Sequence, residues 1–297
     1  MERLRAELSH LLGEPLSRLE CINEKADSTL WSLYDSAGHA LPLLAKSFKT
    51  PGMAARLAWK VSLLSRHCGV RMPVVYGVLT HEETPGPDVL LIERLNGVSV
   101  EAPTRTPERW VSLQDQIVEC MLAWHRIDSH GCSGSVGKTQ ELLWPHWYRN
   151  YIERLWETLN QYPKNGLTMQ DKRILFRSRE SLPALFEGFN DNGVLLHGNL
   201  TLRSMLKDAR SDQLLALISP GTMLWGPREY ELFRLYEPGA AEDLLWRYLQ
   251  RAPVAESFMA RRWLYLLWDE IDNLTRYGKM NRPAFDLACR SLLPWIG

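Results

Sequence analysis

The residue types that could carry chemistry are concentrated in one polar loop and in the turn after the next apolar run. Two short apolar runs, 194–196 and 214–218, flank a loop that contains Asn199 and Ser204, and Ser219 follows the second run. This pattern is typical of a two-strand platform that presents side chains from its loops. An amide and two hydroxyls can form hydrogen bonds, but none of them can take up a proton as a carboxylate does. The two serines are also too short, and uncharged, to replace ionised metal ligands.

The elements that must position this platform are predicted from apolar periodicity and from turn residues. Apolar spacing predicts a first helix over residues 2–12. The other expected elements are strands over 16–25, 29–34, 41–49, 72–79 and 88–93 and helices over 50–67, 107–127, 144–159, 168–189 and most of 228–293. Five strands with one main helix, followed by a mostly helical half, predict an α+β protein of two lobes. We place the small lobe at 1–96 and the large lobe at 97–297.

The composition is that of an ordinary globular chain without net charge. Hydrophobic residues make up 45% of the 297 residues, and 35 basic residues balance 35 acidic ones. The net charge therefore gives no reason to expect a nucleic acid or an anionic membrane as a partner. No apolar run approaches ~18 residues and no signal sequence is evident, so we expect a cytoplasmic protein. The five scattered cysteines are expected to be reduced thiols.

Six landmarks occur in a meaningful order along the chain. They are Leu43-Leu44-Ala45-Lys46, 69–73 (GVRMP), 91–97 (LIERLNG), 121–125 (MLAWH), 197–204 (HGNLTLRS) with 218–220 (ISP), and 226–232 (GPREYEL). Together they resemble the aminoglycoside phosphotransferase and choline kinase-like family. The resemblance implies the two-lobed protein kinase-like fold, with a small β-sheet lobe that carries one main helix and a larger, mainly helical lobe.

The same resemblance implies that the catalytic and metal loops are degenerate. Where the family has H-G-D-[LF]-x-x-x-N, a strand and I-D-[PWF], this chain has Asn199 and Ser219 at the two aspartates and Ser204 at the asparagine. The family's first aspartate orients or deprotonates the attacking hydroxyl, and the other two residues hold magnesium. Loss of a positioned base alone typically lowers a rate by ~10²–10⁴. We therefore expect a pseudokinase without a metal site.

A nucleotide cleft is implied around Lys46 and Glu93, which match the phosphate-gripping lysine and the hinge of the family. ATP would be bound there without a standard magnesium site. The helix after Lys46 usually supplies a glutamate partner, but no acidic residue occurs between Lys46 and His81, and Ala58 lies near the matching position. The loop 24–29 has no glycine and adds two carboxylates. The alternative is that Lys46 is only a solvated lysine at a strand end.

His197 and four aromatic residues have both a functional and a structural interpretation. We expect His197 to be a buried histidine that braces the loop through hydrogen bonds rather than a catalytic group. Trp124, Trp147, Tyr151 and Trp225 are candidates for an aromatic wall that holds a cation or a flat ring of a substrate. The alternative, that they pack helices together, is the more common use of such residues.

Three functional hypotheses remain open. The first is a pseudokinase that binds a nucleotide or small molecule and works as a sensor or as a scaffold for a protein partner. The second is an active small-molecule kinase that uses a displaced carboxylate, such as Asp208, Asp212 or Glu229. The third is an interaction protein with a filled cleft.

The segment 131–139 imitates a phosphate-binding P-loop. The G-x-x-x-x-G-K-[ST] spacing would require glycine at position 132, which is Cys132. The segment also follows a predicted helix, whereas a P-loop leaves a strand and opens a helix. We expect a flexible surface loop here.

Overall fold

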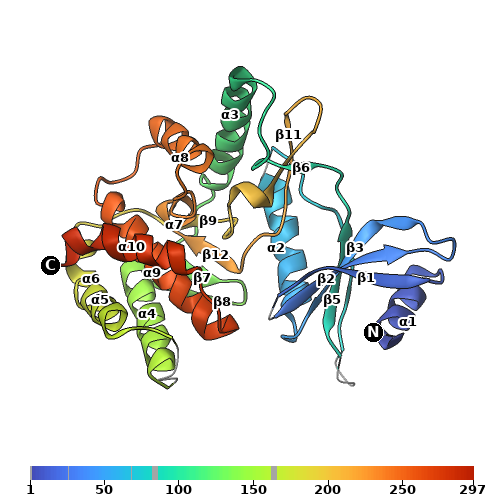
Figure 1. Cartoon of the computed structure of the whole chain (residues 1–297), viewed down its shortest axis with the longest axis horizontal. Coiled ribbons are helices and arrows are strands. Elements are labelled where there is room, and N and C mark those ends of the chain that lie inside the picture. The colour runs from blue at the N-terminus through green and yellow to red at the C-terminus, as the bar shows by residue number, and fades with distance from the viewer. Residues whose placement is uncertain (1, 26, 68, 82–85, 162–165) are drawn as a thin grey trace.

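Two lobes, one built on a sheet and one mainly helical, make up the molecule (Figure 1). The computed structural model describes residues 2–25, 27–67, 69–81, 86–161 and 166–297. The small-lobe elements are α1 (Glu2–Leu12), β1 (Arg18–Glu24), β2 (Ser28–Tyr34), β3 (Ala40–Phe48), α2 (Met53–His67), β4 (Val75–Leu79) and β5 (Asp88–Glu93). The five strands form one antiparallel sheet in the order β1-β2-β3-β5-β4.

The two helices of the small lobe cover opposite faces of this sheet. Successive residues of a strand point to opposite faces. Accordingly, Val89 and Leu91 of β5 join a core cluster with Leu8 of α1, whereas Leu90 joins another with Leu57 of α2. The helix α2 begins at Met53, later than the predicted start at residue 50. The Asp88 carboxylate accepts a hydrogen bond from the Gly52 amide and so satisfies a backbone group at the helix start.

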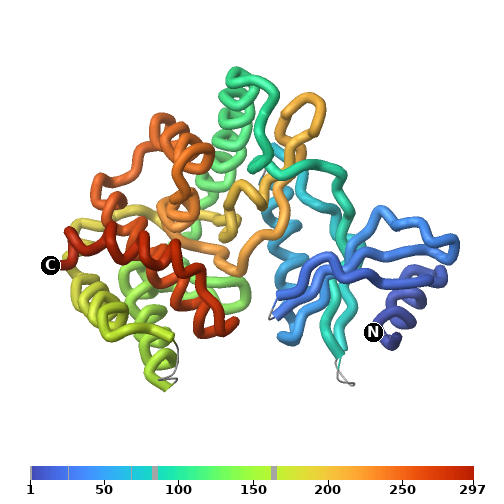
Figure 2. The backbone as a smooth tube through the Cα atoms, in the orientation of Figure 1, coloured from blue at the N-terminus to red at the C-terminus, as the bar shows by residue number. Residues whose placement is uncertain are grey.

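The chain crosses to the large lobe after β5, as the tube in Figure 2 shows. The first strand beyond the crossing, β6 (Val98–Ser99), pairs with β10 (Met205–Lys207) of the large lobe. The α2 helix also joins both lobes, because Val61 and Leu64 belong to a core cluster shared with the long helix α3 (Pro107–Trp124). The position of α2 is therefore fixed by both halves of the molecule.

The large lobe is held together by helices around two extended core clusters. Its remaining helices are α4 (Trp144–Gln161), α5 (Met169–Glu180), α6 (Leu182–Leu185), α7 (Glu229–Leu232), α8 (Ala240–Arg251), α9 (Phe258–Tyr277) and α10 (Arg282–Ile296). The predicted helix over 168–189 is two helices, α5 and α6. No helix in the described part of the chain combines the length and apolar character needed to cross a membrane.

The predicted platform is present, but its two apolar runs lie in different sheets. The run at 194–196 supplies β9 (Val194–Leu195), which pairs with β12 (Met223–Gly226), while β11 (Leu214–Leu217) pairs with β10. A short 3₁₀ helix (Leu202–Ser204) leads from the polar loop into β10. The loop therefore starts from one sheet and ends in the next.

The P-loop imitation at 131–139 is not a flexible loop. It forms a β-hairpin of β7 (Cys132–Ser135) and β8 (Lys138–Glu141), and β7 pairs with β12. The prediction of a surface loop was wrong because the pairing is set by a strand about 90 residues away. The cysteines at 21, 132 and 289 are free thiols, and position 68 lies outside the described residues.

Candidate functional site

A buried carboxylate holds the polar loop by its backbone. Glu231 of α7 is fully buried, and its carboxylate accepts hydrogen bonds from the amides of His197 (2.6 Å), Gly198 (3.1 Å) and Leu200 (3.3 Å). Convergent backbone N–H groups form a small anion-binding concavity, here filled by a side chain of the protein itself. The loop conformation is thus fixed without any ligand.

A buried ammonium holds the same region from the other lobe. Lys60 of α2 is 0% exposed, and its Nζ donates to the carbonyls of His197 (2.9 Å), Gly221 (2.7 Å) and Met223. A protonated lysine has three donors and no acceptor, so three carbonyls satisfy it completely. Burial lowers the pKa of Lys60, and the Glu231 carboxylate nearby acts in the opposite direction.

Two glycines allow the polar loop and the loop after β11 to touch. A Cβ atom at Gly221 would lie 2.2 Å from the Gly198 carbonyl oxygen. Gly198 has φ +78°, a conformation that favours glycine. The Gly221 amide also donates to the His197 carbonyl (3.0 Å). The two loops are therefore in direct backbone contact.

The three positions that match the family's reactive residues are engaged with backbone atoms or exposed. The side-chain amide of Asn199 donates a hydrogen bond to the Ser219 carbonyl (3.0 Å). The Ser204 hydroxyl is buried, donates to the Thr201 carbonyl (2.8 Å) and accepts from the Thr201 amide (2.9 Å), which closes the short 3₁₀ turn. Ser219 is exposed and has φ 55°. None of these side chains presents a base.

Magnesium, which the resemblance implies, does not fit these residues. The ion prefers octahedral oxygen ligation that includes one or two carboxylates. The Ser204 hydroxyl is used within its own turn, and Ser219 carries no charge. In the part of the chain that the structure describes, no group of three or more His, Cys, Asp or Glu side chains could hold a metal ion.

The side chain of His197 lies in the core. It is 0% exposed and stacks on Trp124, with ring centroids 5.7 Å apart. Burial, together with the nearby Lys60 ammonium, lowers the pKa of His197 to about 3. A ring that stays neutral and inaccessible fits the expected structural role, although the hydrogen bonds that brace the loop come mainly from the His197 backbone.

A pocket lies beside these loops, between the two lobes. Its apolar walls come from the small-lobe sheet and α2 on one side and from the β10–β11 region on the other. The apolar lining residues are Leu30, Leu44, Leu57, Val61, Pro73, Leu90, Ile92, Leu95, Leu206, Ile218 and Pro220. The polar lining residues are Asn23, Lys25, Ser28, Lys46, Glu93 and Ser219. Apolar walls with a few polar groups are typical of a small-molecule site.

The structure places Lys46 inside this pocket, together with Lys25 from the loop between β1 and β2. Burial, and secondly the Lys25 charge, lowers the pKa of Lys46, while Asp27 raises it. Among the described residues Lys46 makes no ion pair, and its ammonium lies 5.2 Å from the centroid of the Phe48 ring. A cation without an acidic partner in a mostly apolar pocket favours an anionic ligand.

Glu93 lines the same pocket but is engaged elsewhere. Its carboxylate pairs with Arg71 and accepts from the Val74 amide (3.2 Å). Glu93 is the one acidic residue among the described lining residues. The pocket therefore carries an excess of positive charge.

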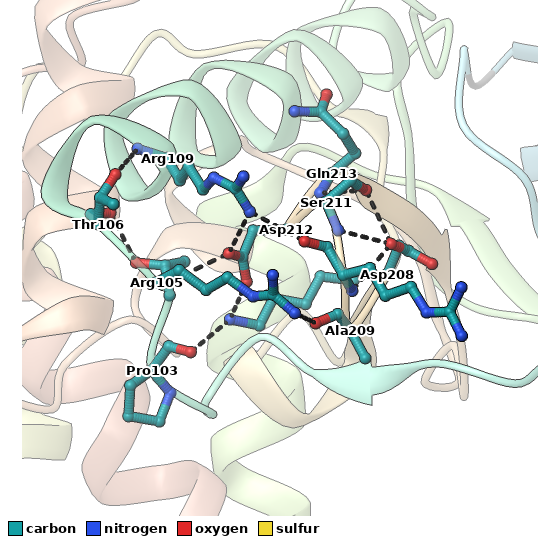
Figure 3. Close-up of polar contacts among 12 residues, drawn as sticks. Pro103, Arg105, Thr106, Arg109, Asp208, Ala209, Ser211, Asp212 and Gln213 are labelled. Carbon is teal, nitrogen blue, oxygen red and sulfur yellow. Dashed lines mark hydrogen bonds and ion pairs between the residues drawn. The ribbon is translucent and has the colours of Figure 1, made fainter.

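The displaced carboxylates of the rival kinase hypothesis lie outside this pocket. Figure 3 shows Asp212 in the turn of the β10–β11 hairpin, where its carboxylate accepts a hydrogen bond from the Arg105 backbone amide and pairs with the Arg109 guanidinium of α3. Asp212 also pairs with Lys207 (2.9 Å), whose hydrogen bond is the main cause that lowers the pKa of Asp212 to about 2. Asp208 accepts hydrogen bonds within the hairpin turn.

The third displaced carboxylate is equally unavailable. Glu229 is 1% exposed, and Arg261 donates to both of its oxygens at 2.7 and 2.8 Å. The Tyr265 hydroxyl donates to the same carboxylate. A base in this position could not reach a hydroxyl in the pocket.

The four aromatic residues do not form one wall. Trp124 is fully buried, and Trp147 is 4% exposed and stacked between Trp144 and Tyr151, so both pack the core and cannot line an open pocket. Tyr151 and Trp225 are partly exposed and pack at the edges of different core clusters. The structure thus corrects the assignment of Trp124 and Trp147.

Comparison with known proteins decides the family. The family model described as the phosphotransferase enzyme family matches residues 20–271. The chain belongs to this phosphotransferase family. The uncharacterized protein YcbJ of Escherichia coli K12 is 70% identical over 296 residues and is covered over its full length, as is this chain.

Solved structures of the phosphotransferase family support the fold. A candidate fructosamine-3-kinase from Haemophilus somnus has a TM-score of 0.70 at 18% identity, with 98% of this chain and 96% of that chain covered. Aminoglycoside phosphotransferase APH(4)-Ia has a TM-score of 0.69 at 15% identity, with 98% and 96% covered. The kinase-like fold and the family predicted from the landmarks are therefore confirmed.

Three residues of the site were missed in the sequence. Lys25 lies in a loop that was noted for its carboxylates, and Glu231 lies in a landmark that was used only for the family resemblance. Lys60 had a detectable signal, because it falls within the apolar stripe of α2 formed by Leu57, Val61 and Leu64. A lysine on a buried stripe requires acceptors that only the three-dimensional structure identifies.

Proposed function

We propose that this protein is a pseudokinase that binds a nucleotide, or a similar anionic ligand with a flat ring, without transferring a phosphoryl group. The observation that supports binding most directly is the pocket, in which Lys25 and Lys46 face apolar walls from both lobes. A ring would lie between the walls and the anionic part would meet the two ammonium groups. Lys46 matches the family's phosphate-gripping lysine, and Lys25 adds a second positive charge to the same pocket.

The absence of transfer is inferred from the loop chemistry. Asn199 cannot accept the proton of an attacking hydroxyl, and Ser204 is closed into its own turn. Asp212 is engaged by Lys207 and Arg109, and Glu229 is engaged by Arg261. A protein that binds without turnover would act as a sensor of its ligand or as a scaffold for a protein partner.

The test is a thermal-shift titration with ATP and ADP, in EDTA and in magnesium. We expect a rise in melting temperature in EDTA that follows the saturation of one site. Stabilisation that requires magnesium would contradict the proposal. The absence of any response would favour an interaction protein with a filled cleft.

The Lys46→Met variant tests the anion contact. We expect it to weaken nucleotide binding by about tenfold or more, since hydrogen bonds to charged groups contribute ~1.5–3 kcal/mol. The matched control is Lys49→Met, which removes an exposed lysine at the end of the same strand and outside the pocket lining. If both variants bound the nucleotide equally well, Lys46 would not be part of the binding site.

Turnover is measured on the unaltered protein and on the triple variant Asn199→Asp, Ser204→Asn, Ser219→Asp. ATP turnover at an ordinary kinase rate by the unaltered protein would refute the pseudokinase proposal and favour an active small-molecule kinase. Turnover gained only by the triple variant would support it.

A further inference from the structure

Lys60 is the most deeply buried cation that the proposed binding site leaves unexplained. It lies outside the pocket lining, and its side chain is completely enclosed. A buried charge is strongly unfavourable unless it is paired or fully hydrogen-bonded. An apolar residue would be the ordinary occupant of this stripe of α2.

The acceptors of Lys60 come from both loops that are degenerate in this protein. The His197 carbonyl directly precedes Gly198 and Asn199 in the polar loop. The Gly221 carbonyl follows Ser219 in the second loop, the loop after β11, and the Met223 carbonyl lies where that loop enters β12. One ammonium therefore joins both loops of the large lobe to a helix of the small lobe.

Residues next to Lys60 on α2, and residues of the loop that Lys60 contacts, form two walls of the pocket. Leu57 and Val61 of α2 line it, and so do Ile218 and Ser219 of the second loop. Leu57 lies one helical turn from Lys60, on the same side of α2. A change in the contact between Lys60 and the loops would move two walls of the pocket relative to each other.

We propose that Lys60 is a positioning residue for the ligand site, an internal cation that holds α2 and the two loops in the arrangement that binds the ligand. This inference rests on the proposed function, because it assigns Lys60 a role in that same pocket. The positive charge is essential to this role, because three carbonyl oxygens converge on one point. An apolar residue of the same length would remove this donor from all three carbonyls, and the His197 carbonyl would keep only the Gly221 amide.

The decisive experiment is chemical rescue of Lys60→Ala, with ADP in EDTA as the probe. We expect the variant to bind ADP about tenfold more weakly or worse, within the usual range of coupling between sites. Adding n-propylammonium should raise its melting temperature and restore ADP affinity. n-Propanol has a similar shape without the charge and should do neither.

The matched control is Leu64→Ala, which opens a cavity on the same helix without removing a cation. In this variant n-propylammonium and n-propanol should have the same effect on the melting temperature and on the ADP affinity. Wild-type affinity of Lys60→Ala for ADP would overturn the proposal, as would equal rescue by propanol and propylammonium. If the unaltered protein binds no nucleotide, the proposed function fails, while rescue of the melting temperature still tests the contact between Lys60 and the loops.

Hydrogen exchange of the unaltered protein decides the matter if Lys60→Ala does not fold in any condition. Because coupling is reciprocal, ADP should slow exchange at 197–200 and 221–224, which lie outside the pocket lining. Protection confined to the lining residues would overturn the proposal.

Discussion

Two buried histidines make the stability of the protein dependent on pH. Burial lowers the pKa of His125 and of His197 to about 3, against an ordinary value of 6.5. The unfolded chain therefore binds more protons than the folded protein between these two pH values. We expect the free energy of unfolding to fall as the pH drops from 6.5 towards 3, by roughly 1.4 kcal/mol per pH unit for each histidine.

Denaturant titrations of His197→Asn at several pH values test this expectation. The free energy of unfolding of this variant should depend less steeply on pH, because the contribution of His197 is absent, whatever the stability of the variant at pH 7. His146→Asn is the control, because it removes an exposed histidine instead of a buried one. An unaltered slope in His197→Asn would show that its ring is not kept neutral by burial.

The limits of sequence reasoning are clear at single residues. The neutral types at 199, 204 and 219 and the lack of an acidic partner on α2 could be read directly from the sequence. The hydrogen-bond partners could not, because the carbonyls around Lys60 lie more than 130 positions away in the chain. The same holds for Trp124, because its stack on His197, which marks it as a core residue and not a pocket wall, is visible only in the structure.

At the scale of elements, the contact between the polar loop and the loop after β11 depends on glycine. We expect Gly221→Ala to destabilise the protein by roughly 1–3 kcal/mol, the usual range for a side chain forced into a packed site. The added Cβ would lie 2.2 Å from a backbone oxygen, which cannot rotate away as a side chain does. Chemical denaturation measures the change.

Gly69→Ala is the control for this substitution. Gly69 has no positive φ and no heavy atom within 4 Å of an added Cβ. A Gly221→Ala variant as stable as this control would mean that the two loops can separate freely.

Elements were predicted well where local pattern decides them and poorly where distant pairing decides them. The helix over 2–12 and the strand over 88–93 were found with their observed bounds. The β7–β8 hairpin was missed because its residues are mostly polar, and β7 is stabilised by β12. Likewise, nothing local shows that β9 and β11 belong to different sheets.

For the molecule as a whole, one hydrogen bond between the lobes holds the loop that carries Lys25. The Tyr277 hydroxyl at the end of α9 donates to the Asp27 carboxylate (3.3 Å), 250 positions away. We expect Tyr277→Phe to speed hydrogen exchange at residues 27–29 and to change global stability by only about 0.5–1.5 kcal/mol, the net value of one hydrogen bond.

Tyr76→Phe is the control, because Tyr76 is 58% exposed on the edge strand β4. Unchanged exchange at 27–29 in Tyr277→Phe would show that the loop is held by the small lobe alone. The accompanying Lys49 amide bond to the Asp27 carbonyl (2.9 Å) would then account for its order.

The left-handed backbone at Ser219 bears on how far this protein has moved from its relatives. Aspartate and asparagine are among the few residues other than glycine that adopt such a conformation readily. An aspartate could therefore return to position 219 with no rearrangement of the chain. Position 204 differs, because an asparagine there would have to replace both hydrogen bonds that the Ser204 hydroxyl makes with Thr201. Under the proposed pseudokinase function, an acidic residue is therefore easier to restore in the loop after β11 than an asparagine is in the polar loop.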